Sequence, residues 1–233
     1  TAEKERTATK LELAAEIQAD ALPNAFPAFP DHKEFDIFAG MTPAKEVGGD
    51  FYDFFLIDET HLGIVIADVS DKDVPAALFM MSAKTLIRSY AKTETSPAKV
   101  MQAVNDHICE NNRHLMFVTV WFGILDLATG TIRAVNAGHE NPALMPAGGR
   151  FNLLRDQHSI IVGLRKGVRY QELEINLTPG AKIFLYTDGI PDAHNAADEV
   201  FGEERIAAVL NEVREKSPEE LLLHMKKAVD AFV

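Results

Sequence analysis

The sequence lacks the features of disulfide-stabilised and membrane-spanning proteins. Its 233 residues include a single cysteine, Cys109, so no disulfide can form within the chain and a reducing, cytoplasmic location is expected. Cys109 lies in a predicted helix, where we interpret it as an ordinary packed side chain rather than a reactive thiol. No stretch approaches the roughly 20 consecutive apolar residues that span a membrane. The N-terminal segment has no apolar core, which argues against a signal peptide.

Positive charge is also scarce. The chain carries 23 Lys and Arg residues against 35 Asp and Glu residues, which gives a formal net charge of −12 at pH 7. An acidic surface repels nucleic acids and anionic membranes, so neither is expected as the main partner. A hydrophobic fraction of 47% with 25% charged residues is typical of a soluble globular protein. The length is sufficient for one substantial domain with its own core.

The spacing of apolar residues predicts a mixture of helices and antiparallel strands. Strands are expected at Phe35–Met41, His61–Val69, Phe117–Leu125, Thr131–Ala137, Tyr170–Leu177 and Lys182–Tyr186. Helices are expected at Glu3–Leu22, at Val74–Tyr90, from Ser96 onward and in two C-terminal segments, the last opening with the capping box Ser217–Glu220. Turn residues at Ala128–Gly130 join two of the strands into a hairpin. Hairpins with helices grouped between them predict a layered α+β domain.

The predicted N-terminal helix carries an apolar stripe that fits two interpretations. The stripe consists of Leu11, Ala14, Ala15, Ile17, Ala21 and Leu22. The helix either packs on its own domain or forms the end of a coiled coil that arrives from an upstream sensor domain, and a coiled coil would also allow a homodimer. The chain does not begin with methionine, so we expect it to belong to a longer protein. Residues 1–30 are therefore expected to be a linker and helix, and residues 31–233 the main domain.

Three acidic residues lie where apolar strands end. Asp68 follows LGIVIA, Asp188 follows KIFLYT, and Asp50 follows Gly48 and Gly49. A buried carboxylate costs free energy unless a cation or hydrogen bonds compensate it, although each acid alone could also cap a turn. Oxygen ligands without a His or Cys cluster favour Mg²⁺ or Mn²⁺ over zinc. Because two such ions can hold an activated water for in-line attack on phosphorus, the three acids suggest phosphoester hydrolysis.

Asp53 follows Asp50 by three residues but is expected to have a different role. Residues two apart share a face of a strand, so Asp50 and Tyr52 lie on one side while Phe51 and Asp53 lie on the other. We therefore predict that Asp53 is a structural, hydrogen-bonded acid.

Most of the eight histidines are scattered without ligand-like spacing. His139 is the exception that we expect near a site, because it follows a predicted strand in a turn rich in Gly, Asn and Pro.

Five motifs together resemble one family. They are VGGDFYD (residues 47–53), ADVSDKDVPAAL (67–78), NAGHENPAL (136–144), LYTDGIPDA (185–193) and FGEERI (201–206). With the preceding segment LELAAEIQADALP, they resemble the stage II sporulation protein E family of bacterial serine phosphatases, a branch of the metal-dependent PPM-type protein phosphatases. The match runs in order from about Leu11 to the C-terminus.

The resemblance implies a fold and an activity. The fold is a four-layer α/β/β/α sandwich, in which two antiparallel sheets pack face to face and the metal site lies at one edge. The activity is hydrolysis of phosphoserine or phosphothreonine on a protein by a water that two Mn²⁺ or Mg²⁺ ions activate. The substrate in this family is commonly an anti-sigma-factor antagonist, whose dephosphorylation releases a sigma factor.

The resemblance also implies roles for individual residues. By motif, Asp50 would bridge the two ions, Asp68 and the backbone carbonyl of Val69 would bind the second ion, and Asp188 would complete the first. Lys45, five residues before Asp50, either presents its charge to the substrate phosphate or is a solvated loop lysine.

Two departures from the family pattern affect these expectations. Asp71 and Asp73 replace the usual glycines, and their charge could attract a further cation or hinder a phosphate. Family members end with a paired-aspartate segment and a last strand that supply a metal ligand, whereas this sequence ends in a helix at AVDAFV. We therefore expect residues 31–233 to form a PPM-type domain that lacks its C-terminal strand and binds the first ion weakly or not at all.

Two other functions remain open from the sequence. One is a catalytically weak or inactive pseudophosphatase that binds an anti-sigma-factor antagonist as an interaction module. The other is a metal-binding α+β domain unrelated to phosphate, which the ordered motifs disfavour.

Overall fold

The computed structural model describes residues 2–43 and 46–233. Its helices are α1 (Ala2–Asp20), α2 (Asp73–Ala91), α3 (Pro97–Glu110), α4 (Glu203–Glu212) and α5 (Pro218–Phe232). Its strands are β1 (Phe51–Leu56), β2 (His61–Val69), β3 (Val118–Asp126), β4 (Thr131–Ala137), β5 (Ala143–Met145), β6 (Asn152–Leu153), β7 (Leu173–Asn176) and β8 (Lys182–Phe184). The predicted mixture of helices and strands is thereby confirmed.

The strands form two antiparallel sheets. The larger has the order β1-β2-β3-β4-β7, and the smaller has the order β6-β5-β8. The predicted hairpin joins β3 to β4, and its turn places Gly130 at φ +73°, where a Cβ atom would lie 2.2 Å from the carbonyl oxygen of Leu177. In the large sheet Asp68 of β2 lies opposite Thr119 of β3. This register brings the end of β2 beside the beginning of β3.

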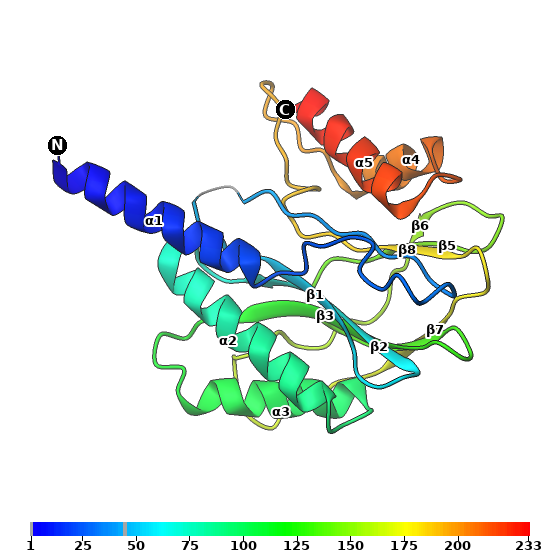
Figure 1. Cartoon of the computed structure of the whole chain (residues 1–233), viewed down its shortest axis with the longest axis horizontal. Coiled ribbons are helices and arrows are strands. Elements are labelled where there is room, and N and C mark those ends of the chain that lie inside the picture. Colours follow the sequence, from blue (N-terminus) through cyan, green and yellow to red (C-terminus); the bar gives the residue numbers. More distant parts are fainter. Residues whose placement is uncertain (1, 44–45) are drawn as a thin grey trace.

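Helices cover the outer face of each sheet, which gives four layers (Figure 1). On one side α2 and α3 pack on the large sheet through residues such as Met80, Ile87, Met101, Val65 and Phe122. On the other side α4 and α5 pack on the small sheet through residues such as Ile206, Leu210, Met225, Met145 and Phe151. A third apolar cluster, which includes Leu62, Trp121 and Ile132, fills the space between the sheets. The predicted α/β/β/α sandwich is confirmed.

Helix caps occur where the sequence predicted them. Pro97 follows the N-cap Ser96, whose side chain accepts a hydrogen bond from Lys99 N. The capping box at the start of α5 is complete, because Ser217 Oγ accepts from Glu220 N and Glu220 Oε2 accepts from Ser217 N. Such side chains satisfy backbone groups that the first helical turn leaves unpaired.

The strand predicted at Phe35–Met41 is wrong. A strand needs a neighbouring strand edge for its backbone hydrogen bonds, and no described residues supply one here. The segment instead packs through aromatic rings, with centroid distances of 4.5 Å for Phe26 and Phe38 and 5.6 Å for Phe29 and Phe35. It covers an apolar cavity of about 520 Å³ lined by both sheets and α5. The strands predicted at Tyr170–Leu177 and Lys182–Tyr186 are shorter than expected.

The N-terminal helix projects from the sandwich (Figure 1). Its last turn approaches the domain, where Gln18 and Leu22 are buried, whereas Leu13 and Ile17 are 57% and 60% exposed. Ile17 was predicted to lie on a packed or coiled-coil stripe, and here it faces solvent. Among the described residues, no helix is long and apolar enough to cross a membrane.

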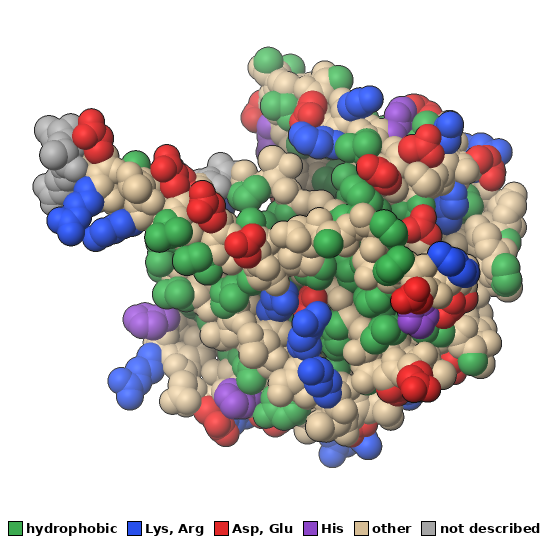
Figure 2. All heavy atoms as spheres, viewed as in Figure 1, with side chains coloured by type: hydrophobic (Ala, Val, Ile, Leu, Met, Phe, Trp, Pro, Cys, Tyr) green, Lys and Arg blue, Asp and Glu red, His purple; other side chains and the backbone are tan. Residues whose placement is uncertain are grey.

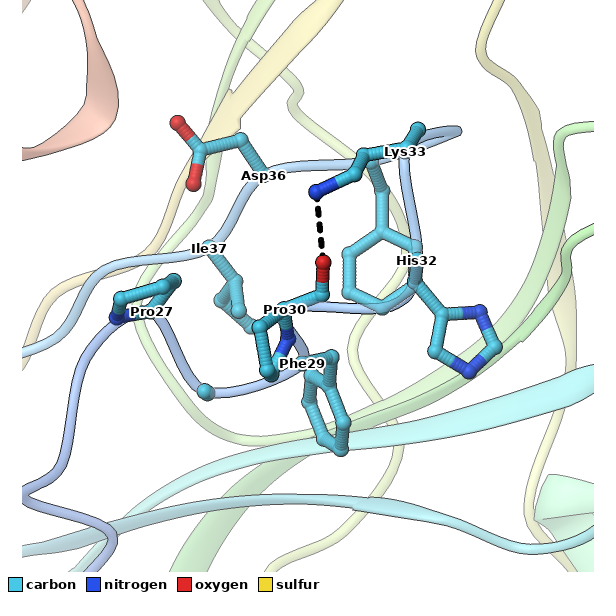
Figure 3. A pocket seen from close by; sticks show the side chains of 9 residues that line it. Pro27, Phe29, Pro30, His32, Lys33, Asp36 and Ile37 are labelled. Carbon is cyan, nitrogen blue, oxygen red and sulfur yellow. Dashed lines mark hydrogen bonds between the residues drawn. The ribbon is translucent and has the colours of Figure 1, made fainter.

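A shallow pocket lies in the loop that follows α1. Nine residues between Pro27 and Ile37 line a volume of about 260 Å³, and Lys33 Nζ donates a hydrogen bond to the carbonyl oxygen of Pro30 at 2.6 Å (Figure 3). None of the acids predicted to bind metal lines this pocket, so it is separate from the candidate site.

Candidate metal centre

Three separate segments deliver the predicted acids to one edge of the space between the sheets. Asp50 precedes β1, Asp68 is the next-to-last residue of β2, and Asp188 follows β8. Along β2, Val65, Ala67 and Val69 belong to the core under the helices, so the alternating Asp68 points to the other face, toward the small sheet. Asp68 therefore lies on the side of β2 where its charged neighbours are Asp50 and Asp188.

The three carboxyl groups are close enough to affect one another. Burial, a hydrogen bond with Asp50 and the negative charges of Asp50 and Asp188 raise the pKa of Asp68 to about 8. Burial and the charges of Asp50 and Asp192 raise the pKa of Asp188. The positive charge of Lys72 opposes both shifts. Carboxylates that repel one another in this way form a region of strong negative potential, which a cation would neutralise.

Asp50 is held from both sides. Thr187 Oγ1 donates a hydrogen bond of 2.7 Å to Asp50 Oδ2, which ties the turn before β1 to the segment after β8. The preceding Gly49 packs against the end of β2, since a Cβ atom there would lie 2.9 Å from the carbonyl oxygen of Val69. Glycine is therefore needed for the turn to approach Val69, the residue whose carbonyl was predicted to bind metal.

His139 lies behind the acids and connects the two sheets. Its Nε2 is 3.1 Å from the carbonyl oxygen of Tyr186, and its Nδ1 is 2.9 Å from Thr119 Oγ1. A carbonyl oxygen only accepts hydrogen bonds, so Nε2 carries the hydrogen and Nδ1 accepts from the Thr119 hydroxyl. Burial lowers the pKa of His139 to about 4, so the ring is neutral at pH 7. The expectation that His139 lies near the site agrees with this position.

Asp53 has the structural role that strand alternation predicted. It is 1% exposed, and its Oδ2 lies 3.1 Å from both Lys84 Nζ and Arg88 Nε of α2. Arg88 also lies over the ring of Phe55, 4.7 Å from its centroid. Asp53 therefore joins β1 to α2 on the face opposite Asp50.

The two residues that replace family glycines adopt glycine-like backbone conformations. Asp71 has φ +77° and Asp73 has φ +71°, both in the left-handed region that L residues adopt at a cost. They flank Lys72, the N-cap of α2, and Asp71 Oδ1 accepts a hydrogen bond from Lys72 N. The fold thus keeps the loop geometry that glycine would allow without strain.

The chemistry of the donors fits a hard divalent cation. The carboxylates of Asp50, Asp68 and Asp188 and the carbonyl of Val69 are oxygen donors, which Mg²⁺ and Mn²⁺ prefer. Their mutual repulsion and the close approach that Gly49 permits are the features expected around bound cations. Within residues 2–43 and 46–233, however, no three acidic, His or Cys side chains are already arranged to hold an ion. The arrangement is a cluster of donors that metal binding would have to draw together.

The structure places further residues at the candidate site that the motifs did not single out. It leaves the predicted role of one residue, Lys45, untested. Two threonines were not predicted. Thr187, which lies within the LYTDG motif, contacts Asp50, and Thr119 contacts His139. Gln18 of α1 was not predicted either, because the sequence shows only a polar residue near the end of a helix. Lys45 lies outside the described residues.

Comparison with known proteins agrees with the geometry. The family model of Stage II sporulation protein E (SpoIIE) matches residues 58–232. Protein IcfG of Synechocystis sp. is 31% identical over 229 residues, covering 86% of this chain and 35% of that protein. Phosphoserine phosphatase RsbP of Bacillus subtilis is 31% identical over 195 residues, covering 81% of this chain and 47% of that protein. The chain therefore spans less than half the length of these two relatives.

Solved structures share the fold. The SiaA-PP2C domain of Pseudomonas aeruginosa superposes with a TM-score of 0.84 at 21% identity, covering 99% of this chain and 92% of that one. RsbX, solved in complex with magnesium, gives a TM-score of 0.59 at 16% identity, covering 82% of each chain. The family match over three quarters of the sequence, on a sandwich that PP2C-type domains share, shows that the chain belongs to the stage II sporulation protein E family.

Proposed function

We propose that this chain is a metal-dependent protein serine/threonine phosphatase domain. The observation that carries the proposal is the convergence of Asp50, Asp68 and Asp188 from three segments at one edge of the sandwich, where the charge of Asp50 raises the pKa of both Asp68 and Asp188. Two relatives of the chain, from Bacillus subtilis, are named phosphoserine phosphatases, which supports the same reaction here.

The residues at the edge would each have a distinct task. Asp50 would bridge two Mn²⁺ or Mg²⁺ ions, Asp68 and the Val69 carbonyl would bind the second, and Asp188 would bind the first. When bound, such ions lower the pKa of water and neutralise phosphate oxygens. Thr187 orients the Asp50 carboxylate through its 2.7 Å hydrogen bond. His139, neutral and buried, links β3, whose Thr119 lies opposite Asp68, to the segment after β8 that carries Asp188.

A lysine would complete the site on the substrate side. Lys45 remains the residue proposed from the family resemblance. Lys72 is a second candidate, because it is exposed and its charge acts on both Asp68 and Asp188. Replacing each lysine by alanine should raise KM for a phosphopeptide more than it lowers kcat if the lysine binds the phosphate.

The substrate that we propose is phosphoserine or phosphothreonine on a regulatory protein such as an anti-sigma-factor antagonist. The family resemblance supports the anti-sigma-factor antagonist, and the names of two Bacillus subtilis relatives, phosphoserine phosphatases RsbP and RsbU, support phosphoserine. Incubation of the chain with a panel of phosphorylated antagonists, followed by mass spectrometry of the phosphosite, would identify the substrate.

We further propose that α1 connects residues 31–233 to an upstream sensor domain and contributes to a homodimer. Leu13 and Ile17 of α1 and Val74 and Leu78 of α2 are exposed, and Figure 2 shows hydrophobic side chains gathered over these two elements. Large exposed apolar patches often mark interaction surfaces. Ile17→Lys should shift the chain toward monomer in light scattering, and an unchanged mass would contradict the dimer.

The phosphatase assay separates this function from the alternative of a pseudophosphatase. Asp188→Asn should abolish Mn²⁺-dependent release of phosphate from a phosphoserine peptide. Asp192→Asn is the matched control, because Asp192 is four residues away and its charge acts on Asp188 without being a predicted ligand. Equal rates in the parent and in Asp188→Asn would contradict the proposal, and peptide binding without turnover in the parent would favour a pseudophosphatase.

A further inference from the structure

Gln18 is a buried polar residue at the end of α1. It is 5% exposed, whereas its neighbour Ile17 is 60% exposed. Its side chain forms two hydrogen bonds to one residue, because Nε2 donates to the Gly48 carbonyl oxygen at 2.6 Å and Oε1 accepts from Gly48 N at 3.0 Å. A primary amide offers a donor and an acceptor side by side, so Gln18 pairs with Gly48 as a second backbone segment would.

The paired residue belongs to the turn that carries Asp50. Gly48 is followed by Gly49, where an added Cβ atom would lie 2.9 Å from the carbonyl oxygen of Val69 and 3.3 Å from the Cβ atom of Ala76. The turn is therefore fixed by β2 and α2 through Gly49 and by α1 through Gly48. Without Gln18, the backbone N–H and C=O of Gly48 would lose their partners, and the turn would keep only its attachments through Gly49 and through the Thr187 hydrogen bond to Asp50.

We propose that Gln18 is a positioning residue for the metal centre, which holds the turn at residues 47–50 so that Asp50 faces Asp68 and Asp188. The inference rests on the proposed metal-dependent function. Gln18 also gives α1 a direct link to the site. Leu13 and Ile17 on the same helix are exposed, whereas Gln18 makes a specific polar contact with the domain. A displacement of α1 would act on Asp50 through this amide.

Two substitutions at Gln18 and one control test the proposal. Gln18→Met keeps the length of the side chain but removes both hydrogen bonds, and Gln18→Glu keeps the acceptor but replaces the donor with a charged oxygen that faces the Gly48 carbonyl. Tyr52→Phe is the control, since the Tyr52 hydroxyl donates to the Pro23 carbonyl oxygen at 2.8 Å and ties the segment after α1 to β1 without contacting Gly48. Each variant is compared with the parent by amide hydrogen exchange without metal, by calorimetric titration with Mn²⁺ and by thermal unfolding.

The proposal predicts a specific pattern. Both Gln18 variants should exchange the amides of residues 47–50 faster than the parent and bind Mn²⁺ about 10-fold more weakly, as is typical when a residue that supports a ligand is lost. Tyr52→Phe should lower the unfolding temperature but leave the Mn²⁺ affinity within about 2-fold of the parent. Unchanged exchange or unchanged Mn²⁺ affinity in both Gln18 variants, or an equal loss of affinity in Tyr52→Phe, would overturn it.

Failure of the metal site itself gives a different result. If Asp50→Asn binds Mn²⁺ as tightly as the parent, the proposed site is wrong, and the exchange rates alone then decide whether Gln18 positions the turn.

Discussion

His139 Nε2 donates a hydrogen bond to the carbonyl oxygen of Tyr186 at 3.1 Å, which links the turn after β4 to the segment after β8. The other ring nitrogen accepts from Thr119 on β3, so one buried imidazole connects the two sheets beside the acids. Removal of the ring would leave the Thr119 hydroxyl and the Tyr186 carbonyl without these partners in the interior. Buried polar groups left in this state are costly.

His139→Leu should therefore destabilise the fold. We expect the free energy of unfolding to fall by about 3 kcal/mol, from the unpaired Tyr186 carbonyl, from the Thr119 hydroxyl that keeps only a 3.4 Å contact with the Asp68 carbonyl oxygen, and from imperfect packing. Urea denaturation measures the change. His114→Leu is the control, because His114 is exposed and such surface changes usually stay within about 0.5 kcal/mol. A loss below about 1 kcal/mol at His139 would show that the bridge contributes little.

Asp53 and Asp50 should respond to substitution in opposite ways. Asp53→Asn removes the charge that compensates Lys84, whose side chain is 11% exposed, and it should cost about 3 kcal/mol of unfolding free energy. Arg88 is 41% exposed and can regain water, which limits the loss. Asp50→Asn should instead abolish Mn²⁺ binding while the metal-free protein stays at least as stable. Denaturation and calorimetry on both variants distinguish the two roles, and a loss of Mn²⁺ binding in folded Asp53→Asn would contradict the assignment.

The contrast between these two aspartates shows what the sequence could predict. Strand periodicity alone placed Asp50 and Asp53 on opposite faces, because the period of two is a local property of the backbone. The ordered motifs predicted the four-layer sandwich and brought Asp68 and Asp188 to the same edge, which no local pattern could have done.

Other features depend on contacts that the sequence does not reveal. Phe35–Met41 has the composition of a strand, but a strand also requires a partner edge, and pairing is decided by distant segments. Gln18 reads as one more polar residue on an amphipathic helix, and its importance depends on the backbone of Gly48, thirty positions away. Thr119 on β3 and Thr187 after β8 acquire their contacts with His139 and Asp50 only when the sheets pack together.

The stability of the metal-free protein should fall as the pH rises from 6.5 to 8. Burial and neighbouring acids raise the pKa of Asp68 to about 8, far above its value of about 4 in an unfolded chain. Between these two values the folded state binds more protons than the unfolded state, so the free energy of unfolding decreases with pH until Asp68 is ionised. His139, with a pKa lowered to about 4, stays neutral in the folded protein throughout this window.

Thermal unfolding in a metal chelator would show this effect. After allowance for solvent screening of the partly exposed group, we expect a loss of about 1 kcal/mol, or a midpoint roughly 2–4 °C lower at pH 8 than at pH 6.5. Asp68→Asn should remove most of the slope, and Mn²⁺ should raise the midpoint of the parent more at pH 8 than at pH 6.5. A parent midpoint that rises with pH would contradict the mutual repulsion of the acids.

Glycine at positions 71 and 73 should stabilise the loop before α2. Asp71 and Asp73 have φ values of +77° and +71°, which cost an L residue about 1 kcal/mol each but cost glycine almost nothing. Glycine loses part of this gain because it is more flexible in the unfolded chain. The double variant also loses the hydrogen bond from Lys72 N to Asp71, so its free energy of unfolding should be only about 1 kcal/mol higher without metal.

Two further variants separate backbone strain from charge in this loop. Asp198→Gly relieves a similar conformation, with φ +62°, at an exposed position in another loop, so at a pH where His194, 3.9 Å away, is neutral it reports mainly strain. Asp71→Asn removes a charge while keeping a residue that tolerates positive φ, so it reports charge alone. Asp71→Ala should be less stable than the parent, because alanine tolerates this conformation worse than aspartate. The order glycine, aspartate, alanine in chemical denaturation supports strain at Asp71, and alanine as stable as glycine would contradict it.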